Sequence, residues 1–443
     1  MGVFLRDRPG QIVCPGWNGT VQRRPRSGGK KKPFSAWWVF TLLKRMVEEM
    51  IIKGFTASAV PAGIKYPDRL HLGLICSSVP AVTAGVFTKS LVKAAPVVLD
   101  IERLKQGRAQ AILVNSGCAN ACTGEQGMEA AKLTGRLAAD ALGIPEEMVQ
   151  VASTGVIGAQ LNVAAFESAM EALVGGLASE NFEKVARAIM TTDTVSKMAT
   201  RTIALGGKEV NFLGMAKGAG MIMPNMATML AFVVTDAQIG FPELNSSLRQ
   251  GVARTFNRIT VDGDTSTNDM VLVMANGAAD NKWIDEETPE DQQLFQETLE
   301  DVLKELALKI VADGEGATKC ITIRVCGAKE ADEAEKMART VANSNLVKTA
   351  FFGEDANWGR IIAAMGRCGV RFYPEWVDIS FGDVTLVKNG IGQGAGVEEE
   401  ASKVLREKNI VVTIDLKDGN ACEEIYTCDF SIDYVKINAD YRS

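Results

Sequence analysis

From residue 54 onward, short apolar runs typical of buried strands alternate with longer stretches of helical periodicity. The strand-like runs, rich in Val, Ile, Leu, Met and Ala, cover residues 111–114, 149–152, 229–234, 270–274, 321–325 and 411–416. The helical stretches cover 126–142, 164–174, 182–190, 331–342 and 358–365, and a longer one begins after Thr288-Pro289 and ends before Gly314. This alternation predicts an α/β protein.

The length of the chain indicates more than one ordinary hydrophobic core. With 443 residues, 47% hydrophobic and 23% charged, the chain has the composition of a globular protein and can form two domains or one large layered body. A two-residue turn at Gly206-Gly207 is expected to join two short strands. The acidic run 292–305 is interpreted as the solvated face of the long helix.

Positive charge is concentrated at the N-terminus. Residues 1–50 carry ten Lys/Arg and three Asp/Glu, a net charge of +7, which leaves −13 for the remainder because the whole chain carries −6. An acidic body of this kind argues against nucleic-acid binding, which requires clustered basic side chains to contact phosphates.

The first fifty residues are predicted to be a disordered basic extension. Residues 1–33 lack apolar periodicity, and the apolar run 34–43 is too short to cross a bilayer. A secretory signal is the alternative, although Lys44-Arg45 interrupts the run before any cleavage site of the usual kind. We expect instead that translation starts at Met46 or Met50 and that the upstream stretch is a start-codon artefact.

Cysteine and histidine content narrow the chemistry. The nine cysteines, at positions 14, 76, 118, 122, 320, 326, 368, 422 and 428, have no C-x-x-C spacing and are predicted to be reduced thiols of a cytoplasmic protein. His71 is the one histidine and is interpreted as a half-buried strand residue. Catalytic triads and metal sites that need several imidazoles are therefore disfavoured. A nucleophile in this chain would need a base other than histidine to activate it.

A glycine-rich segment, K-G-A-G-M-I-M-P-N-M-A-T (217–228), leads directly into the apolar run 229–234 and places Thr228 at the start of a strand. An ordinary turn followed by a strand threonine is one interpretation. The other is self-cleavage: the Thr228 hydroxyl attacks the Ala227 carbonyl, and hydrolysis of the resulting ester frees a new N-terminus. Its α-amine, with a reference pKa of about 7.7–8.0, can then deprotonate the hydroxyl near neutral pH.

Two further loops follow predicted strands. Residues 153–158, S-T-G-V-I-G, offer hydroxyl and backbone donors at a tight glycine turn, as an oxyanion hole requires. Residues 115–120, N-S-G-C-A-N, have the same character but are expected to be structural.

Together these segments resemble the glutamate N-acetyltransferase / ornithine acetyltransferase family from about Gly54 to the C-terminus. The cleavage block of that family is matched at 217–222 and 224–230. Other matching blocks are 115–124, 153–158, 191–194, 262–269, 313–319, 353–360 and 438–443. Two departures are Ser443, where the family usually ends in threonine, and Met223.

The resemblance implies roles for individual residues. Thr228 would be the nucleophile after cleavage between Ala227 and Thr228, and the oxyanion would be stabilised by Thr154 and Gly155. Substrate binding would fall to Thr191, Lys217, Thr228, Glu315, Asn438 and Ser443. Lys217 suits a substrate carboxylate and Glu315 a substrate ammonium.

The resemblance also implies the fold, the reaction and the assembly. The expected fold is the stacked αββα sandwich shared with self-cleaving aminopeptidases, with a smaller C-terminal α/β part. Acetyl would pass from N-acetylornithine to Thr228 and then to glutamate, with acetyl-CoA as a second donor in bifunctional members. Residues 51–227 would form an α chain and 228–443 a β chain, two of each per molecule, with no metal or prosthetic group.

Three other interpretations stay open. The first is a self-cleaving amidohydrolase or aminopeptidase, in which water takes the acyl group. The second is a nucleotide-binding protein, because a strand at 384–387 precedes the G-x-G-x-x-A pattern 390–395, a helix at about 398–407 and Asp415. The third is an oligomeric scaffold without activity.

Overall fold

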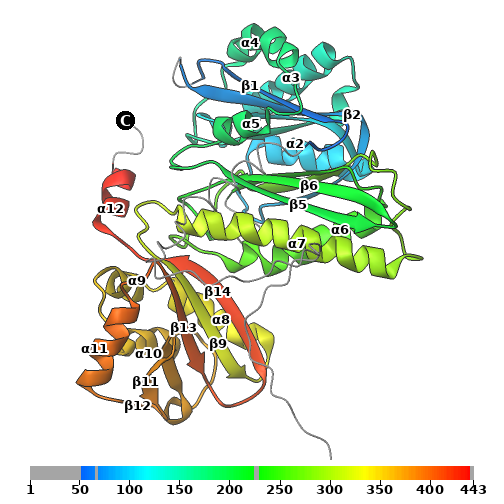
Figure 1. Cartoon of the computed structure of the whole chain (residues 1–443). Helices are drawn as coiled ribbons and strands as arrows, with labels where there is room; N and C mark the ends of the chain where they lie inside the picture. The colour runs from blue at the N-terminus through cyan, green and yellow to red at the C-terminus, as the bar shows by residue number, and fades with distance from the viewer. Residues whose placement is uncertain (1–50, 65–67, 224–228, 440–443) are drawn as a thin grey trace, which may run out of the picture. The chain divides into compact units, whose positions relative to one another are not determined.

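The computed structural model describes residues 51–64, 68–223 and 229–439. These residues fall within one compact unit, Arg45–Ser443 (Figure 1). The predicted basic extension and the two candidate start residues, Met46 and Met50, lie outside the described residues.

The first sheet has eight strands and supplies the frame for most of the molecule. Its strand order is β4-β3-β2-β8-β7-β6-β5, and β1 pairs with the long strand β2. The strands are β1 Phe55–Pro61, β2 Leu70–Phe87, β3 Arg108–Asn115, β4 Val149–Ser153, β5 Lys197–Leu205, β6 Lys208–Lys217, β7 Leu230–Thr235 and β8 Met270–Ala275. The four predicted strands in this region are confirmed as β3, β4, β7 and β8.

Three apolar clusters show that this sheet is folded into a sandwich. Side chains of β1, β2 and β3 meet those of β6, β7 and β8 in one shared core. Helices α3 Gly124–Leu142 and α4 Val163–Gly175 cover one outer face, and α6 Phe241–Arg254 and α7 Pro289–Ala312 cover the other (Figure 1). The order helix, strand, strand, helix confirms the predicted αββα layers.

Local sequence features explain several element boundaries. The two-residue turn between β5 and β6 has Gly206 at φ 54° and Gly207 at φ 78°, a conformation that side chains other than glycine rarely adopt. The long helix α7 begins at Pro289 and buries one apolar stripe, so its acidic residues face outward as predicted. Two shorter helices, α2 Ala95–Arg103 and α5 Phe182–Ala188, complete this part.

A smaller sheet of six strands forms the C-terminal part, as expected. Its order is β12-β11-β10-β13-β9-β14, with strands β9 Cys320–Ala328, β10 Asp378–Phe381, β11 Val384–Lys388, β12 Ile391–Gly392, β13 Asn409–Asp415 and β14 Ala421–Cys428. Its helices are α8 Ala331–Ala342, α9 Asn345–Phe352, α10 Trp358–Gly366 and α11 Ala395–Val404, and a last helix, α12 Ile432–Ala439, follows β14.

The glycine pattern at 390–395 does not form a nucleotide-binding turn. Strand β11 pairs antiparallel with β12 through Val387↔Gly392 and Lys388↔Ile391, so Gly390 and Gly392 belong to a hairpin, and Gly394 is the N-cap of α11. A dinucleotide fingerprint instead joins a strand directly to a helix within a parallel unit. The structural context that this interpretation required is therefore missing.

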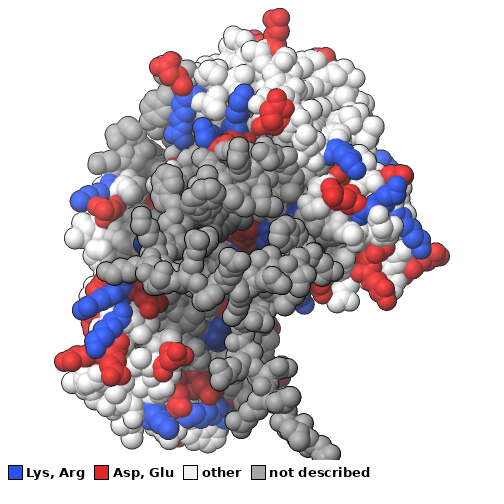
Figure 2. Space-filling view, viewed as in Figure 1, with Lys and Arg blue, Asp and Glu red and all other residues white. Residues whose placement is uncertain are grey.

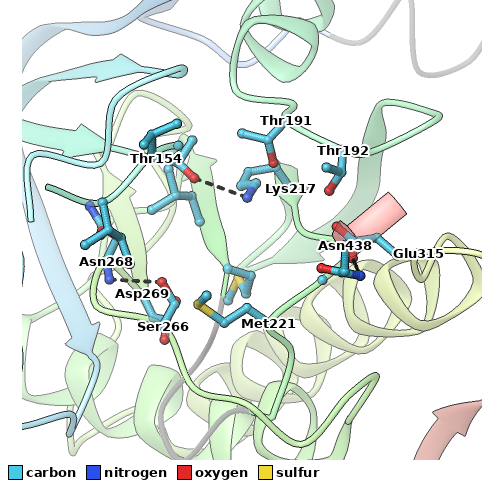
Figure 3. Close-up of a pocket in the computed structure, with 16 residues that line it drawn as sticks. Thr154, Thr191, Thr192, Lys217, Met221, Ser266, Asn268, Asp269, Glu315 and Asn438 are labelled. Carbon is cyan, nitrogen blue, oxygen red and sulfur yellow. Dashed lines mark hydrogen bonds between the residues drawn. The ribbon is translucent and has the colours of Figure 1, made fainter. Parts of the chain in front are cut away.

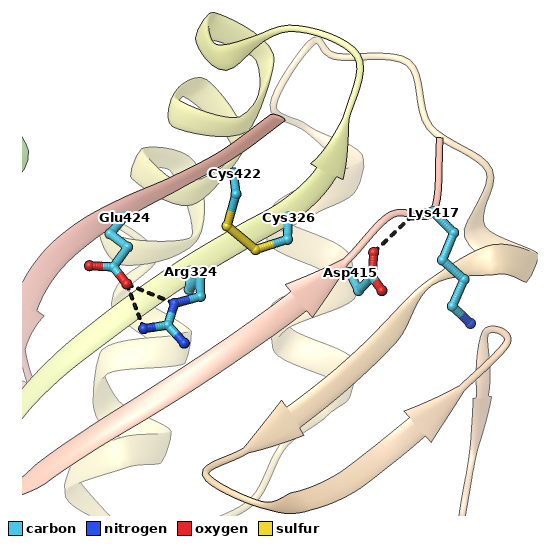
Figure 4. The surroundings of a disulfide bond; sticks show 6 residues. All are labelled: Arg324, Cys326, Asp415, Lys417, Cys422 and Glu424. Atoms are coloured by element: carbon cyan, nitrogen blue, oxygen red, sulfur yellow. Dashed lines mark hydrogen bonds and ion pairs between the residues drawn. A yellow bond between two sulfur atoms is a disulfide. The ribbon is translucent and has the colours of Figure 1, made fainter. Parts of the chain in front are cut away.

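One cysteine pair corrects the sequence prediction. Cys326 and Cys422 form a disulfide between β9 and β14, with Cα atoms 4.0 Å apart (Figure 4). The prediction that all cysteines are reduced is wrong for this pair, because antiparallel pairing brings together two residues 96 positions apart. The free thiols among the described residues are Cys76, Cys118, Cys122, Cys320, Cys368 and Cys428.

The surface charge and the hydropathy of the helices indicate whether nucleic acid or a membrane is a partner. Acidic and basic side chains are interspersed over the described face shown in Figure 2, in line with the argument against a phosphate-binding surface. Within the described ranges, no helix has the length and hydropathy needed to cross a membrane.

Candidate active site

A cavity of about 270 Å³ opens where the glycine-rich segment meets the loops that follow β4 and precede β8. Its lining residues are Thr154, Gly155, Val156, Ile157, Thr191, Thr192, Lys217, Gly220, Met221, Met229, Leu230, Ser266, Asn268, Asp269, Glu315 and Asn438 (Figure 3). The structure thus brings together six residues that the sequence predicted for the site, from five separate segments. Ala227, Thr228 and Ser443 lie outside the described residues, whereas Met229, which is bonded to Thr228, is in the cavity wall.

The turn after β4 presents two groups of the predicted oxyanion hole. Gly155 has φ 133°, and a Cβ there would lie 2.4 Å from the carbonyl carbon of Gly117, so only glycine fits. Gly155 lines the cavity, and its N–H has no backbone partner among the described residues. The Thr154 hydroxyl accepts a hydrogen bond from Lys217 Nζ at 3.2 Å. The turn therefore offers one free donor and one hydroxyl to a developing negative charge.

The loop 115–120 supports this turn rather than the cavity. Asn115 donates to Cys118 O at 3.0 Å and accepts from the Ser153 hydroxyl at 2.7 Å. Asn268 donates from Nδ2 to Ala119 O at 2.6 Å and to Ser153 O at 2.8 Å, and so joins three loops. The expected structural role of this loop agrees with these contacts.

His71 takes no part in the cavity. It is 2% exposed in β2, and its Nδ1 lies 3.0 Å from the Ser116 hydroxyl. The interpretation as a strand histidine is confirmed, and the residue is more deeply buried than expected.

Lys217 is the cation of the cavity. It ends β6 and is buried, and burial lowers the pKa of its ammonium while Asp193 opposes that change. Asp193 accepts hydrogen bonds from Gly218 N at 2.7 Å and from Thr191 N at 3.0 Å. Burial alone would raise the pKa of Asp193, but Lys217 and Lys197 lower it to about 2. A negative carboxylate therefore stands behind Lys217 at neutral pH.

Asp193 belongs to a buried ionic network. Lys197 is fully buried and lies 2.6 Å from Asp193 and 2.5 Å from Asp313. Thr194 donates to Asp313 through both its backbone N–H and its hydroxyl. This network fixes the segment 191–197, which carries Thr191 and Thr192, against the loop that precedes Glu315.

Glu315 is the anion on the far side of the cavity. It is 6% exposed, and its backbone N–H donates to Ala219 O at 2.9 Å. Asn438 on α12 donates to Glu315 Oε2 at 2.7 Å (Figure 3). A Cβ at Gly220 would lie 2.4 Å from this carboxylate, which explains why glycine is needed there.

Asp262 holds the described part of the glycine-rich segment. Its carboxylate accepts from Met221 N at 2.5 Å and from Ile222 N at 2.7 Å, while Met221 has φ 57°. The Tyr434 hydroxyl on α12 donates to the same carboxylate at 3.4 Å. Asp262 thus links the segment before the predicted cleavage site to the helix that carries Asn438.

Sequence reasoning did not assign five residues that the cavity contains or depends on: Asp193, Thr192, Ser266, Asn268 and Asp269. They lie in the family-like blocks 191–194 and 262–269, but no spacing rule separates a lining residue from a supporting one within such a block. Within the described ranges, no group of three His, Cys, Asp or Glu is arranged to hold a metal ion. The expectation that the site needs no metal or prosthetic group stays a prediction.

Comparison with known proteins gives consistent matches over the body of the chain. The model of the ArgJ family matches residues 56–443. A protein of Desulfotalea psychrophila described as arginine biosynthesis bifunctional protein ArgJ is 67% identical over 394 residues, which cover 89% of this chain and 100% of that protein. The protein of the same description from Geobacter sulfurreducens is 51% identical, with the same coverage of each chain.

Solved structures are similar as well. Among them is the crystal structure of arginine biosynthesis bifunctional protein argJ from Bacillus halodurans, which is 45% identical in sequence. The match covers 48% of this chain and 99% of that chain, with a TM-score of 0.46.

Proposed function

This chain belongs to the ArgJ family, and from that premise we propose how its cavity transfers an acetyl group. The chain is an acetyltransferase of arginine biosynthesis. We propose that it takes acetyl from N-acetylornithine and gives it to glutamate by way of an acetyl-threonine at Thr228. A new N-terminus at Thr228 would form first, by self-cleavage after Ala227.

The observation that carries this proposal is the placement of opposite charges on one small cavity. Lys217 can bind the α-carboxylate of an amino acid, and Glu315 with Asn438 can bind an ammonium group. Both charged residues are buried, so a ligand that matches them is favoured over water. N-acetylornithine and glutamate each carry a carboxylate next to a substituted or free amine, and ornithine adds a second ammonium group.

Self-cleavage would proceed by an N-to-O acyl shift. The Thr228 hydroxyl adds to the Ala227 carbonyl, the peptide C–N bond breaks to give an ester, and water hydrolyses the ester to free the α-amine. Hydrogen bonds on both sides of the predicted cleavage site favour this step, because they fix the backbone before and after it. Asp262 holds Met221 and Ile222 on one side, and the carbonyl of Met229 accepts from Met270 N at 3.1 Å on the other.

Acetyl transfer would follow a ping-pong path. The α-amine of Thr228 takes the hydroxyl proton as the oxygen attacks the acetyl carbonyl, and the Gly155 N–H and Thr154 hydroxyl stabilise the oxyanion. The amide C–N bond then breaks, and ornithine leaves with the proton. The amine of glutamate next attacks the carbonyl of the acetyl ester, the C–O bond to Thr228 breaks, and the Thr228 hydroxyl is restored as N-acetylglutamate forms. Thr191 would help to orient the substrate, and Ser443 would supply a further hydroxyl.

Other features of the proposal concern cofactor, assembly and compartment. The residues named above account for the chemistry without a metal or prosthetic group, and acetyl-CoA would serve as a second acetyl donor. We propose an assembly of two α and two β chains in the cytoplasm. Most described cysteines are free thiols, which agrees with a reducing compartment, while the Cys326–Cys422 disulfide weighs against it.

Intact mass and N-terminal sequencing test self-cleavage. The purified protein should give two chains, the second running from Thr228 to Ser443, and the Thr228→Ala variant should stay whole. An uncut wild-type chain that retains full activity would remove Thr228 as an N-terminal nucleophile. The mass of the first chain also shows whether it begins at Met1, Met46 or Met50.

Substrate assays separate the transferase from the amidohydrolase alternative. N-acetylornithine should be consumed at a sustained rate only when glutamate is present. Equal consumption without an acceptor would mean that water takes the acyl group and that the protein is a hydrolase. Formation of N-acetylglutamate from acetyl-CoA and glutamate would establish the second donor.

A further inference from the structure

Helix α12 supplies one side of the candidate ammonium subsite, yet little of the helix is buried. Of its residues, Tyr434 is half-buried and the others are exposed. Asn438 Nδ2 donates to Glu315 Oε2 at 2.7 Å and to the carbonyl of Tyr434 at 3.0 Å, so both N–H groups of the amide are used (Figure 3). The amide oxygen is then the group that can accept a hydrogen bond from a bound ammonium.

Three stacked side chains, here called the Lys348 stack, join α12 to the C-terminal part. The rings of Phe430 and Tyr434 are stacked, with centroids 4.6 Å apart and planes at 17°. The ammonium of Lys348, on α9, lies over the Phe430 ring at 4.7 Å from its centroid. Both contacts are favourable, so the stack fixes the direction in which α12 leaves the smaller sheet.

Lys348 anchors the stack. It is 1% exposed, and its ammonium donates to the Thr427 hydroxyl at 2.8 Å and to the carbonyl of Cys428. Its own carbonyl accepts from Phe430 N at 3.2 Å. A buried ammonium is costly unless its N–H groups find acceptors, so Lys348 has little freedom to leave this position.

The loop that carries Glu315 is held by other contacts. Ser431 donates from its hydroxyl to Gly316 O at 2.6 Å, and Asp429 accepts from Lys319 N at 2.9 Å. Both of these partners precede α12. The Glu315 loop is therefore fixed independently of the helix, whereas the position of the amide on α12 depends on the Lys348 stack.

We propose that Phe430 and Tyr434 are positioning residues for specificity, which hold α12 where its amide completes an ammonium subsite with Glu315. The inference rests on the proposed function and deepens it. In N-acetylornithine the α-nitrogen is acetylated, so the ammonium that this subsite binds is the terminal one. A substrate that lacks a terminal ammonium should not depend on the Lys348 stack.

Two acetyl donors that differ in this ammonium test the role. N-acetyl-L-norvaline has the carbon skeleton of N-acetyl-L-ornithine but ends in a methyl group. The wild-type protein should prefer the ornithine compound by about 10- to 100-fold in kcat/KM, because the methyl group cannot make the charge-assisted hydrogen bonds. In a ping-pong reaction, kcat/KM for the donor reports the donor half-reaction alone, so binding of glutamate does not enter this preference.

Variants of the stack should lose this preference selectively. Tyr434→Leu and Phe430→Leu each remove one ring, and Lys348→Met removes the ammonium but keeps the length of the side chain. We expect each to reduce the preference for N-acetylornithine about tenfold and to change kcat/KM for N-acetylnorvaline by less than about twofold. Tyr434→Phe keeps the stack and should keep the wild-type preference. A residue that only supported the fold would lower kcat/KM for both donors together.

Tyr373→Leu is the matched control. Tyr373 packs against Trp376 in the same C-terminal part, with ring centroids 4.3 Å apart, and it does not line the cavity. This control should keep the wild-type preference. If Phe430→Leu or Lys348→Met does not fold, Tyr434→Leu, at the half-buried end of the stack, carries the same comparison.

Several results would overturn the inference. They are a folded Tyr434→Leu variant that keeps the wild-type preference, one that loses activity equally toward both donors, a Tyr434→Phe variant that loses the preference as fully as Tyr434→Leu, and a control that also loses it. Failure of the proposed function appears in other proteins of the series. It would be a wild-type protein that transfers no acetyl group or has no preference for N-acetylornithine, or a Glu315→Gln variant that keeps the preference.

Discussion

At the scale of residues, the cavity depends on a few buried charges whose partners are close. Lys217 faces the cavity with Asp193 behind it, and Glu315 lies across from it with Asn438. Because burial weakens solvent screening, each of these charges contributes more to binding than a surface charge would.

The first prediction concerns Lys217. Lys217→Met keeps the length of the side chain but removes its charge, so a substrate carboxylate loses a charge-assisted hydrogen bond. We expect kcat/KM for N-acetylornithine to fall about 10- to 100-fold, largely through KM. Steady-state kinetics measures this effect. Lys208→Met, at the exposed β5–β6 turn, is the control and should leave both constants unchanged.

The second prediction concerns Asp193. Its folded-state pKa of about 2 is below the unfolded value of 3.8, so its stabilising effect is complete above pH 4 and is lost as pH falls through 2. Asp193→Asn should therefore lower the free energy of unfolding by about 2–4 kcal/mol at pH 7. The difference in the free energy of unfolding between Asp193→Asn and the wild-type protein should be smaller at pH 3.

Urea unfolding at pH 7, 4 and 3 measures that difference. The control is Asp433→Asn, which removes an exposed ion pair with Lys436 and should change stability little at any pH. A difference between Asp193→Asn and wild type that does not depend on pH would show that the charge of Asp193 is not what stabilises the fold.

At the scale of elements, short turns position the functional groups. The turn after β4 contains two glycines in left-handed or extended positive-φ conformations, Gly155 at φ 133° and Gly158 at φ 85°. They differ in their surroundings, because a Cβ at Gly155 would collide with the backbone of Gly117 and Cys118, whereas nothing lies within 4 Å of one at Gly158.

The third prediction uses this difference. Gly155→Ala should force the turn to shift and misplace the oxyanion donor, so kcat should fall about 100- to 1,000-fold. Gly158→Ala should cost about 1–2 kcal/mol of stability through backbone strain alone and should retain kcat. Kinetics and thermal unfolding of both variants measure these effects. Equal kcat values in the two variants would argue against Gly155 as a donor.

The fourth prediction concerns the link between β9 and β14. Among the eight cysteines of the described residues, one disulfide leaves six free thiols. Reduction in denaturant should therefore raise the thiol count of the protein by two. Breaking the disulfide should lower the free energy of unfolding by about 2–4 kcal/mol, because the bond closes a long loop. Thiol titration and urea unfolding of the Cys326→Ser, Cys422→Ser double variant test both points. A thiol count that does not rise on reduction would contradict the bond.

At the scale of the whole molecule, the proposed cleavage site falls within one sheet and not between two domains. Strand β6 precedes the site and β7 follows it, yet they pair antiparallel from Phe212↔Thr235 to Lys217↔Leu230. The core between the two layers also contains residues from both sides of the site. The two chains that the proposed cleavage would produce would therefore share one hydrophobic interior.

The fifth prediction follows from this shared interior. The cleaved protein should elute from a sizing column as one species that contains both chains, and the chains should separate only in denaturant. The uncut Thr228→Ala variant should elute at the same volume under native conditions. Separation of the chains in native buffer would show that the sheet does not hold them together.

Much of the fold could be predicted because local sequence patterns determine where strands, helices and turns form. The strand-like runs became β3, β4, β7, β8, β9 and β13, and the long helix after Thr288 became α7. The glycine turn at Gly206-Gly207 also formed as expected. These features depend on side-chain periodicity and on backbone freedom, which neighbouring residues determine.

The predicted site residues met in one cavity, but their partners could not be foreseen. The sequence pointed to Lys217, Thr154 and Glu315 through resemblance to a family. It did not indicate that Asp193 lies close to Lys217, or that Asp269 lies in the cavity wall. Such relations depend on distances between segments far apart in the chain, and a one-dimensional pattern contains no such distances.

By itself, therefore, the sequence determined the class of fold and the positions of many of its elements, because these follow from local composition and spacing. Through resemblance to a family, it also pointed to the segment in which Thr228 is the proposed nucleophile. Only the tertiary structure decided which charges meet in the cavity, that Gly390 and Gly392 belong to a hairpin, and that Cys326 bonds to Cys422. Each of these depends on how strands pair across the sheets, and strand pairing is set by packing of the whole chain.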